Sequence, residues 1–192
     1  MNDIYYATGN SDKFETVFCF LERNAPHVKL KPCTKDFIEI QSNDQKEIAL
    51  DKARQAWEHL QEPVLVDDSG IYFEKYHKFP GVLTKFVFQG IGLEGLWKLI
   101  EAGEKATFCL HLVYWYGPDQ YEIFESECSG TVTKQKDFLG TPQFPYDTLF
   151  IPDGTTKTYA ELRQAGEHDQ YDYRIGAVKK FLRWYTLQNP IK

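Results

Sequence analysis

The fold class follows from one short stretch, Val64-Leu65-Val66-Asp67-Asp68-Ser69-Gly70. The three apolar residues at its start are typical of a central strand that is buried on both faces. The Asp, Ser and Gly residues after them are favoured in turns, so we expect the strand to end there. In open α/β sheets, ligands bind beyond the carboxyl ends of strands, which makes this end a first place to look for a site.

Strands and helices alternate ahead of this stretch. Residues 4–7 are rich in β-formers and predict a strand. A helix is predicted from Ser11, because apolar residues recur there at the spacing of one helical face, and a short strand is predicted at residues 28–30. Residues 44–61 predict the strongest helix, with alanines along one face and a proline after its end. This order predicts an α/β sheet with at least one crossover.

The second half of the chain predicts a long hairpin and a closing helix. Residues 107–116 and 121–133 are aromatic and β-branched, and Gly117-Pro118-Asp119 between them indicates a hairpin turn. A short helix is predicted at residues 92–99, and a longer one from Asp172. We therefore expect residues 1–192 to form one α/β domain, with a mixed twisted sheet in two lobes that flank a central cleft.

Composition narrows the classes of partner. The chain has 22 basic and 28 acidic side chains and a net charge of −6, so we expect no nucleic-acid partner, whereas a small anion in a cleft is compatible. The four cysteines are scattered, which predicts free thiols rather than a metal site. No apolar run approaches the roughly 20 residues that span a bilayer. Nothing at the start resembles a leader, so we expect no membrane partner and a cytoplasmic location.

The loop between the first strand and the first helix is a candidate anion site. It consists of Thr8, Gly9, Asn10, Ser11, Asp12 and Lys13. A helix N-terminus offers free backbone N–H groups and the positive end of the helix dipole. A lysine in the first turn is unfavourable beside that dipole, so an anionic ligand would explain its placement. The alternative is an ordinary capped helix with a solvated lysine.

The acidic end of the buried strand is a candidate metal site. Successive strand side chains point to opposite faces, so only one of Asp67 and Asp68 can project into a given cleft. Carboxylates suit Mg²⁺, which prefers oxygen ligands and retains several waters. Glu39, in a polar connection, could reach the same ion. The alternatives are a simple turn for the aspartates and a solvated surface position for the glutamate.

Four further segments carry weaker signals. Lys52 lies at the edge of an apolar helical stripe. It could contact a phosphate, or its aliphatic part could cover the apolar surface while the ammonium group reaches solvent. Lys85 follows a Pro-Gly turn, and Arg174 opens the last helix, where it suits bidentate recognition or a surface ion pair. An aromatic loop, residues 144–147, could stack on a base or serve local packing.

The order of these segments is far more specific than any one of them. In this order the segments resemble the motifs of the inosine triphosphate pyrophosphatase family. The matching segments are Thr8-Gly9-Asn10 with Lys13, the acidic and helical stretch 39–52, the strand end 66–70, the stretch 79–85 and the run 144–161. The resemblance covers nearly the whole chain. It implies a two-lobed α/β homodimer that binds a nucleotide between its lobes and hydrolyses aberrant purine triphosphates such as ITP, dITP and XTP to monophosphate and pyrophosphate.

The resemblance also assigns roles by position. Lys13, Lys52 and Lys85 would bind the phosphates, and Glu39 and Asp68 would hold Mg²⁺. Asp68 would also position or deprotonate the attacking water. Mg²⁺ would offset the charge that builds on the phosphoryl oxygens and help to generate the nucleophile. The other implied nucleotide contacts are Thr8, Gly9, Asn10, Ser11, Asp12, Ser69, Phe144, Pro145, Tyr146, Asp147, Tyr173 and Arg174.

Two departures concern the base rather than the phosphates. Pro145 stands where the family has glycine, which removes a backbone donor. Tyr173 stands where the family has a histidine that reads the 6-keto purine edge, although Arg174 follows it as expected. Three hypotheses therefore remain open: hydrolysis of aberrant purine triphosphates, the same hydrolysis on a different base, and nucleotide binding without turnover.

Overall fold

The computed structural model describes residues 3–134 and 144–190. Within these ranges one sheet contains six strands: β1 (Ile4–Ala7), β2 (Leu30–Cys33), β3 (Val64–Phe73), β4 (Lys105–Gly117), β5 (Gln120–Val132) and β6 (Phe150–Pro152). Their order in the sheet is β2-β1-β3-β4-β5-β6. β1 pairs in parallel with β2 and with β3, whereas β5 and β6 are antiparallel. The predicted mixed α/β fold is therefore confirmed. Among the described residues, no helix has the length and hydrophobicity needed to cross a membrane.

The contacts divide the chain into two compact units. Unit 1 comprises residues 1–68, 110–126 and 174–192, and unit 2 comprises residues 69–109 and 127–173. The boundary cuts three strands: β3 (Val64–Phe73), β4 (Lys105–Gly117) and β5 (Gln120–Val132). That the chain forms one domain stays a prediction.

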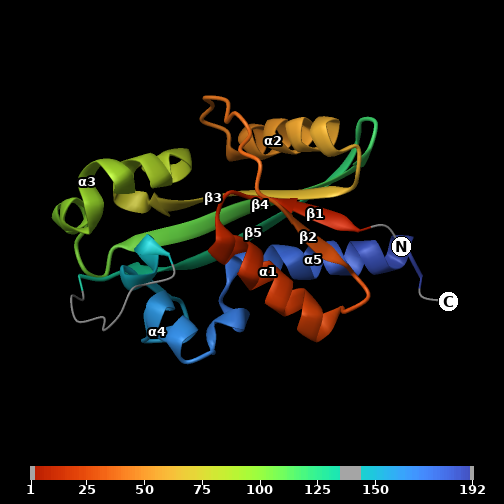
Figure 1. Ribbon diagram of the computed structural model, residues 1–192. Coiled ribbons are helices and arrows are strands. Elements are labelled where there is room, and N and C mark those ends of the chain that lie inside the picture. The colour runs from red at the N-terminus through yellow and green to blue at the C-terminus, as the bar shows by residue number, and fades with distance from the viewer. Residues whose placement is uncertain (1–2, 135–143, 191–192) are drawn as a thin grey trace. The chain divides into compact units, whose positions relative to one another are not determined.

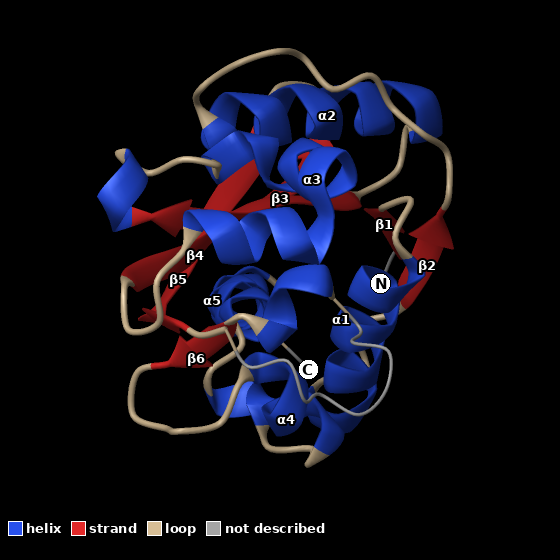
Figure 2. Cartoon of the chain, turned by 90° about the vertical axis from the view of Figure 1, so that its left-hand side faces the viewer, coloured by secondary structure: helices blue, strands red, loops and turns tan. Residues whose placement is uncertain are grey.

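Unit 1 is a layered structure. Its other elements are β1 (Ile4–Ala7), α1 (Ser11–Asn24), β2 (Leu30–Cys33), α2 (Gln45–Leu60) and α5 (Tyr173–Gln188). In it, α2 covers one face of the strands, and α1 and α5 cover the other (Figures 1 and 2).

The core between α2 and the strands explains why this helix is rich in alanine. Ala49, Ala53 and Ala56 are fully buried and pack with Val64 and Val66 of β3. Small side chains let the helix approach the sheet closely. The predicted helix at residues 44–61 is confirmed to within one residue at each end: Asp44 is its N-cap and Gln61 its left-handed C-cap.

Unit 2 contains α3 (Thr84–Leu99), β6 (Phe150–Pro152) and α4 (Tyr159–Gln164). Its core is aromatic: the ring of Phe108 packs edge-on against Phe150 and is stacked on Tyr173, with centroids 4.9 and 4.8 Å away. α3 and α4 lie on opposite sides of the strands of this unit (Figure 1). The prediction of a helix at residues 92–99 found only the second half of α3, which is broken at Gly92 (φ 60°, ψ −172°).

The predicted end of the central strand at Asp67 is wrong. β3 continues through the acidic residues and the glycine to Phe73. Gly70 serves close approach rather than a turn, because a Cβ there would lie 2.3 Å from the carbonyl oxygen of Gly81. Turn-forming composition was outweighed by the burial of Ile71 and Phe73 further along the strand. The second strand was also misplaced, since β2 begins at Leu30 rather than at residue 28.

Candidate functional site

A buried carboxylate, Asp67, organises the candidate site in unit 1. It is only 2% exposed, and it accepts hydrogen bonds from the Tyr6 hydroxyl (2.7 Å), from Lys13 Nζ (3.1 Å) and from Arg174 Nη2 (3.1 Å). These four residues are called the Asp67 cluster below. Because two cations pair with one carboxylate, the cluster has a net positive charge. This charge favours the binding of an anionic ligand nearby.

The members of the cluster are supplied by distant segments. Tyr6 lies on β1, Lys13 in the first turn of α1, Asp67 on β3 and Arg174 at the start of α5. Burial alone would raise the pKa of Asp67, but the charges of Lys13 and Arg174 and the Tyr6 hydrogen bond hold it well below its ordinary value. Burial also lowers the pKa of Lys13 and, together with the Asp67 charge, raises that of Tyr6. Asp67 is therefore the permanent anion of the site.

The next residue, Asp68, has the opposite character. It is partly exposed, as expected from the alternation of side chains along a strand. Burial first, and then the negative charges of Asp67 and Glu39, raise its pKa to about 6, while Lys13 and a hydrogen bond from Gln45 act in the other direction. A carboxyl group with this pKa is mostly ionised near neutral pH and is basic enough to accept a proton.

Glu39 and Lys52 complete the polar group around Asp68. Lys52 Nζ lies 2.7 Å from Glu39 Oε1, and the lysine side chain is 16% exposed, compared with 39% for the glutamate. The charges of Lys52 and Asp68 both act on Lys13. Unit 1 thus brings together Lys13, Glu39, Lys52, Asp68 and Arg174, which the sequence predicted from five separate segments.

The loop before α1 differs in one respect from the expectation. The Asn10 side-chain oxygen accepts the backbone N–H groups of Asp12 (2.9 Å) and Lys13 (3.2 Å), so these two donors are not free. Thr8 Oγ1 accepts the N–H of Asn10 (3.1 Å). Next to Gly9 lies the side-chain oxygen of Asp36, 2.9 Å from where a Cβ would be. The sequence identified the loop, but it did not show that side chains of the loop itself accept hydrogen bonds from these backbone N–H groups.

The remaining predicted residues lie in unit 2. Lys85 is exposed in the first turn of α3, and Ser69 is half-buried on β3. Tyr173 is 5% exposed, with its ring stacked on Phe108 at 8°. The predicted nucleotide contacts of these three residues stay predictions.

The aromatic loop of unit 2 is held by a buried arginine that the sequence did not single out. Arg163 Nε lies 2.6 Å from Asp147 Oδ2, and its Nη2 lies 2.9 Å from Asp172 Oδ2. Its guanidinium also lies over the Phe144 ring, 4.8 Å from the centroid. Pro145 begins a 3₁₀ turn, and the Tyr146 hydroxyl, in that turn, donates to the carbonyl oxygen of Thr84 (2.9 Å). Asp147 thus has a structural partner inside unit 2.

Three residues that contribute to these contacts were not predicted from the sequence, and they differ in whether the sequence contains a signal for them. Arg163 had a signal, because Thr158 and Glu161 form a capping box that places it on a short helix beside the loop. Tyr6 and Gln45 had none, since their partners lie 61 and 23 residues away along the chain.

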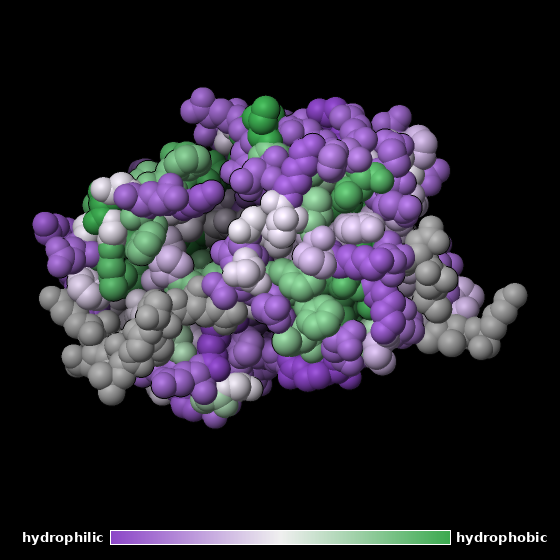
Figure 3. Space-filling model, in the orientation of Figure 1, coloured by the Kyte–Doolittle hydropathy of each residue, from purple (hydrophilic) through white to green (hydrophobic). Residues whose placement is uncertain are grey.

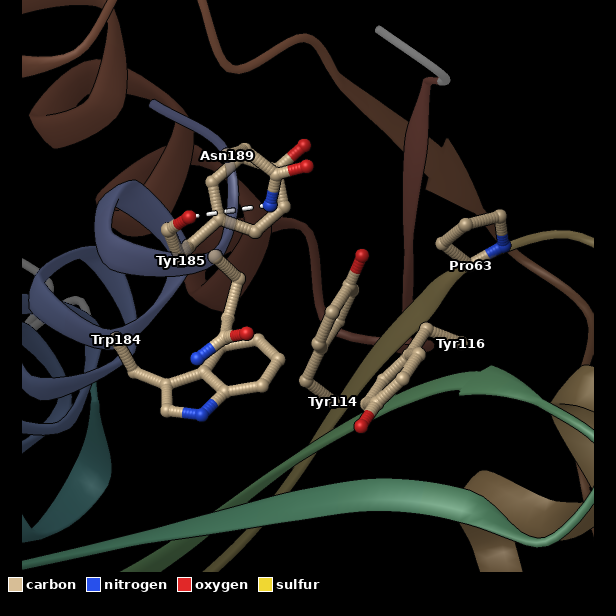
Figure 4. Close-up of a pocket in the computed structure, with 7 residues that line it drawn as sticks. Pro63, Tyr114, Tyr116, Trp184, Tyr185 and Asn189 are labelled. Carbon is tan, nitrogen blue, oxygen red and sulfur yellow. Dashed lines mark hydrogen bonds between the residues drawn. The ribbon is translucent and has the colours of Figure 1, made fainter. Parts of the chain in front are cut away.

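A cavity in unit 1 lies among residues that the sequence did not link to function. Its volume is about 440 Å³. Figure 4 shows the aromatic rings around it, which come from β4 and α5. The residues that line it are Pro63, Tyr114, Tyr116, Trp184, Tyr185, Gln188 and Asn189. None of these carries a formal charge at neutral pH, so the lining offers no ionic partner to a phosphate.

Comparison with known proteins adds the family context. The profile described as the Ham1 family matches residues 4–184. The dITP/XTP pyrophosphatase of Methanopyrus kandleri is 34% identical over 184 residues, covering 95% of each chain. The inosine triphosphate pyrophosphatase of Pyricularia oryzae is 31% identical, covering 95% of this chain and 93% of its own. A HAM1 protein from Coxiella burnetii has the same fold, with a TM-score of 0.78 at 22% identity, covering 97% of this chain and all of its own.

Proposed function

The chain belongs to the Ham1 family, and from this premise we propose that it is a nucleoside triphosphate pyrophosphatase acting on aberrant purine nucleotides such as ITP, dITP and XTP. The reaction adds water across the bond between the α- and β-phosphates and releases the monophosphate and pyrophosphate. The observation that carries the proposal is that Lys13 pairs with the buried Asp67, while the Glu39–Lys52 pair lies near Lys13 and Asp68.

Asp68 is the proposed base. Its carboxylate accepts a proton from the water that attacks the α-phosphorus, and the electron pair of the broken P–O bond leaves with pyrophosphate. The pKa of about 6 suits this step, because general-base efficiency is best when the pKa lies near the working pH. Lys13 and Lys52 offset the negative charge of the phosphate oxygens. The family resemblance assigns the same role to Lys85.

The metal ion proposed for this site is Mg²⁺. Among the described residues, no group of three or more His, Cys, Asp or Glu side chains could hold a metal ion. The two carboxylates of Glu39 and Asp68 nevertheless fit Mg²⁺, which commonly uses one or two protein carboxylates with substrate phosphates and water. The ion would offset charge on the phosphoryl oxygens and help to generate the nucleophile.

Pyrophosphate release and nucleotide binding, the latter measured by calorimetry, test the function together. Pyrophosphate release is followed with Mg²⁺ for ITP, dITP and XTP, against ATP and GTP, and we expect the first group to be preferred. If the best substrate lacks a 6-keto purine, the base assignment is wrong but hydrolysis stands. Tight binding of every nucleotide without any release would instead support the non-catalytic alternative.

The role of Asp68 is tested by Asp68→Asn, which keeps the shape of the side chain. We expect kcat to fall about a hundredfold or more, as removal of a catalytic acid or base typically does, with a smaller change in nucleotide affinity. The matched control is Asp51→Asn on α2, whose carboxylate pairs with Arg54 rather than with the site. Wild-type turnover in the Asp68 variant would refute the assignment.

A homodimer is proposed on the resemblance and on one surface feature. Phe86 and Ile91 of α3 are 60% and 45% exposed, and Figure 3 shows hydrophobic surface over this helix. Exposed apolar patches often mark interaction sites. Light scattering after gel filtration measures the mass, and Phe86→Glu should shift a dimer towards the monomer. The cytoplasmic location stays a prediction from sequence, which cell fractionation tests.

A further inference from the structure

Tyr6 is a buried tyrosine whose hydroxyl reaches into the candidate site. It is 0% exposed and donates a hydrogen bond to Asp67 Oδ1 at 2.7 Å, and its hydroxyl also interacts with the Arg174 side chain. A buried tyrosine hydroxyl requires a partner, and here the partner is the carboxylate that organises the site. Its ring lies 6.5 Å from that of Phe14, the residue after Lys13. Tyr6 therefore touches both the carboxylate and the start of α1.

The two oxygens of Asp67 are used unequally. Oδ1 accepts from Tyr6, whereas Oδ2 accepts from Lys13 Nζ at 3.1 Å and from Arg174 Nη2 and Nε at 3.1 and 3.3 Å. An arginine can otherwise engage both oxygens of a carboxylate through its fork. The terminal torsion of an aspartate is also soft, so the carboxylate alone would not hold one orientation. Both cations thus lie on the oxygen that Tyr6 does not contact.

The three charged members of the cluster differ in their access to a ligand. The side chains of Asp67 and Arg174 are each 1% exposed, whereas that of Lys13 is 20% exposed. Lys13 is thus the member that a phosphate group can reach. If Lys13 turns to a phosphate, Asp67 still has Arg174 and Tyr6 as partners and is not left as an unpaired buried charge.

We propose that Tyr6 is a positioning residue. Its hydrogen bond fixes the orientation of the Asp67 carboxylate, which holds the Lys13 ammonium group where it can bind a phosphate of the triphosphate. This inference rests on the proposed function, because it takes the phosphate as the group that receives Lys13. Without the hydroxyl, the carboxylate can rotate to meet the Arg174 fork with both oxygens, and Lys13 loses its fixed place. Phosphate affinity then falls, while the groups around Asp68 are unchanged.

The test compares Tyr6→Phe with Tyr5→Phe. Tyr5 is the matched control, because it lies on the same strand with its side chain on the opposite face. Calorimetry with Mg²⁺ and the α,β-methylene analogue of ITP gives the dissociation constant, and turnover of ITP gives kcat and KM. We expect Tyr6→Phe to weaken binding about tenfold and raise KM to match, with kcat within about threefold of wild type, as loss of uniform binding predicts. Tyr5→Phe should change none of these.

A double-mutant cycle separates positioning from general support of the fold. In a Lys13→Met background, Tyr6→Phe should weaken binding no further, because its effect acts through Lys13. Asp67→Asn gives a second route: in that background Tyr6→Phe should also have no added effect. Near-ultraviolet circular dichroism confirms that each variant is folded.

The outcomes separate the inference from the function on which it rests. Equal affinity of wild type and Tyr6→Phe in an active enzyme overturns the positioning role alone. Additive effects of Tyr6→Phe and Lys13→Met also overturn it, since they show that the hydroxyl acts elsewhere. A folded wild-type protein that neither binds nor hydrolyses any nucleotide overturns the proposed function and the inference together.

Discussion

At the scale of single residues, Arg163 illustrates how a candidate binding loop is supported from beneath. Its side chain is 6% exposed and pairs with two carboxylates, Asp147 and Asp172, that are themselves buried. The Phe144 ring lies against its guanidinium. A buried charge pair is costly to break from one side only, because the remaining partner stays desolvated. We therefore regard Arg163 as the main support of this loop.

The prediction at this scale concerns stability. Arg163→Met should lower the free energy of unfolding by about 3–5 kcal/mol, the range expected when one partner of a buried pair is removed. Urea denaturation measures the change. Arg54→Met is the matched control, because Arg54 also pairs with two carboxylates, Asp51 and Glu58, but is 47% exposed. A similar loss for both variants would mean that burial of the Arg163 pairs adds nothing.

Residues with a charge or motif of their own were accessible from the sequence. Lys13, Glu39, Lys52 and Asp68 were identified by segment order, and the structure places them together in unit 1. Tyr6 was not, because a tyrosine in a short strand carries no sign of a partner 61 residues away. Such partnerships depend on which strands become neighbours, and one sequence does not reveal that.

At the scale of elements, β3 shows how a glycine can be misread. Gly70 lies in the strand interior, where backbone atoms of Gly81 leave no room for a side chain. The nearby Thr84 hydroxyl ties the same region together: it accepts the N–H of Ile71 (2.9 Å) and donates to the Gly81 carbonyl (2.6 Å). The glycine is thus required by close packing between β3 and the turn before α3.

The prediction for this element compares two glycines of unit 2. Gly70→Ala should destabilise the protein by about 1–3 kcal/mol, the usual cost of overpacking, because the new methyl group meets backbone rather than a flexible side chain. Gly90→Ala, in α3, meets nothing within 4 Å and should be neutral or stabilising by up to about 1 kcal/mol. Thermal unfolding of both variants is the measurement. Equal stability of the two would show that β3 can move away from Gly81 at no cost.

Elements with one clear apolar face were the predictable ones. α1 was located from the spacing of its apolar residues, and α2 from its alanine face and the proline after its end. Both hairpin strands were found within about two residues of their ends. α3 was half missed because it contains three glycines and apolar residues on all sides, which erase the helical period. β6 and α4, at three and six residues, are too short to show a period.

At the scale of the whole molecule, the site depends on parts of the chain that are distant in sequence. The group around Asp67 and Asp68 is formed by residues of β1, the first turn of α1, the N-terminus of α2, β3 and the start of α5. Ligand binding at such a site stabilises the fold by mass action, because only the folded chain presents the group. The unfolding transition of the whole molecule should therefore report on the nucleotide.

The corresponding prediction is a thermal shift. ITP analogue with Mg²⁺ at about a hundred times its dissociation constant should add about 2.7 kcal/mol of stability. For a chain of this size that corresponds to a rise in Tm of about 5–10 °C. EDTA should remove most of the shift if the ion joins the protein carboxylates to the phosphates. An unchanged Tm at saturating nucleotide would contradict a site formed only in the folded chain.

The aromatic cavity of unit 1 has a consequence for observing the molecule. Trp184 meets Tyr114 edge-on with centroids 5.9 Å apart, and Tyr114 is stacked on Tyr116 at 5.2 Å. Aromatic rings held in fixed packing give a near-ultraviolet circular dichroism signal. This signal is lost when the fixed packing is lost. None of these rings belongs to the Asp67 cluster, so their near-ultraviolet signal reports on the packing of the cavity rather than on the cluster. The packing of the cavity and the proposed phosphate binding at the Asp67 cluster can therefore be followed in unit 1 by separate measurements.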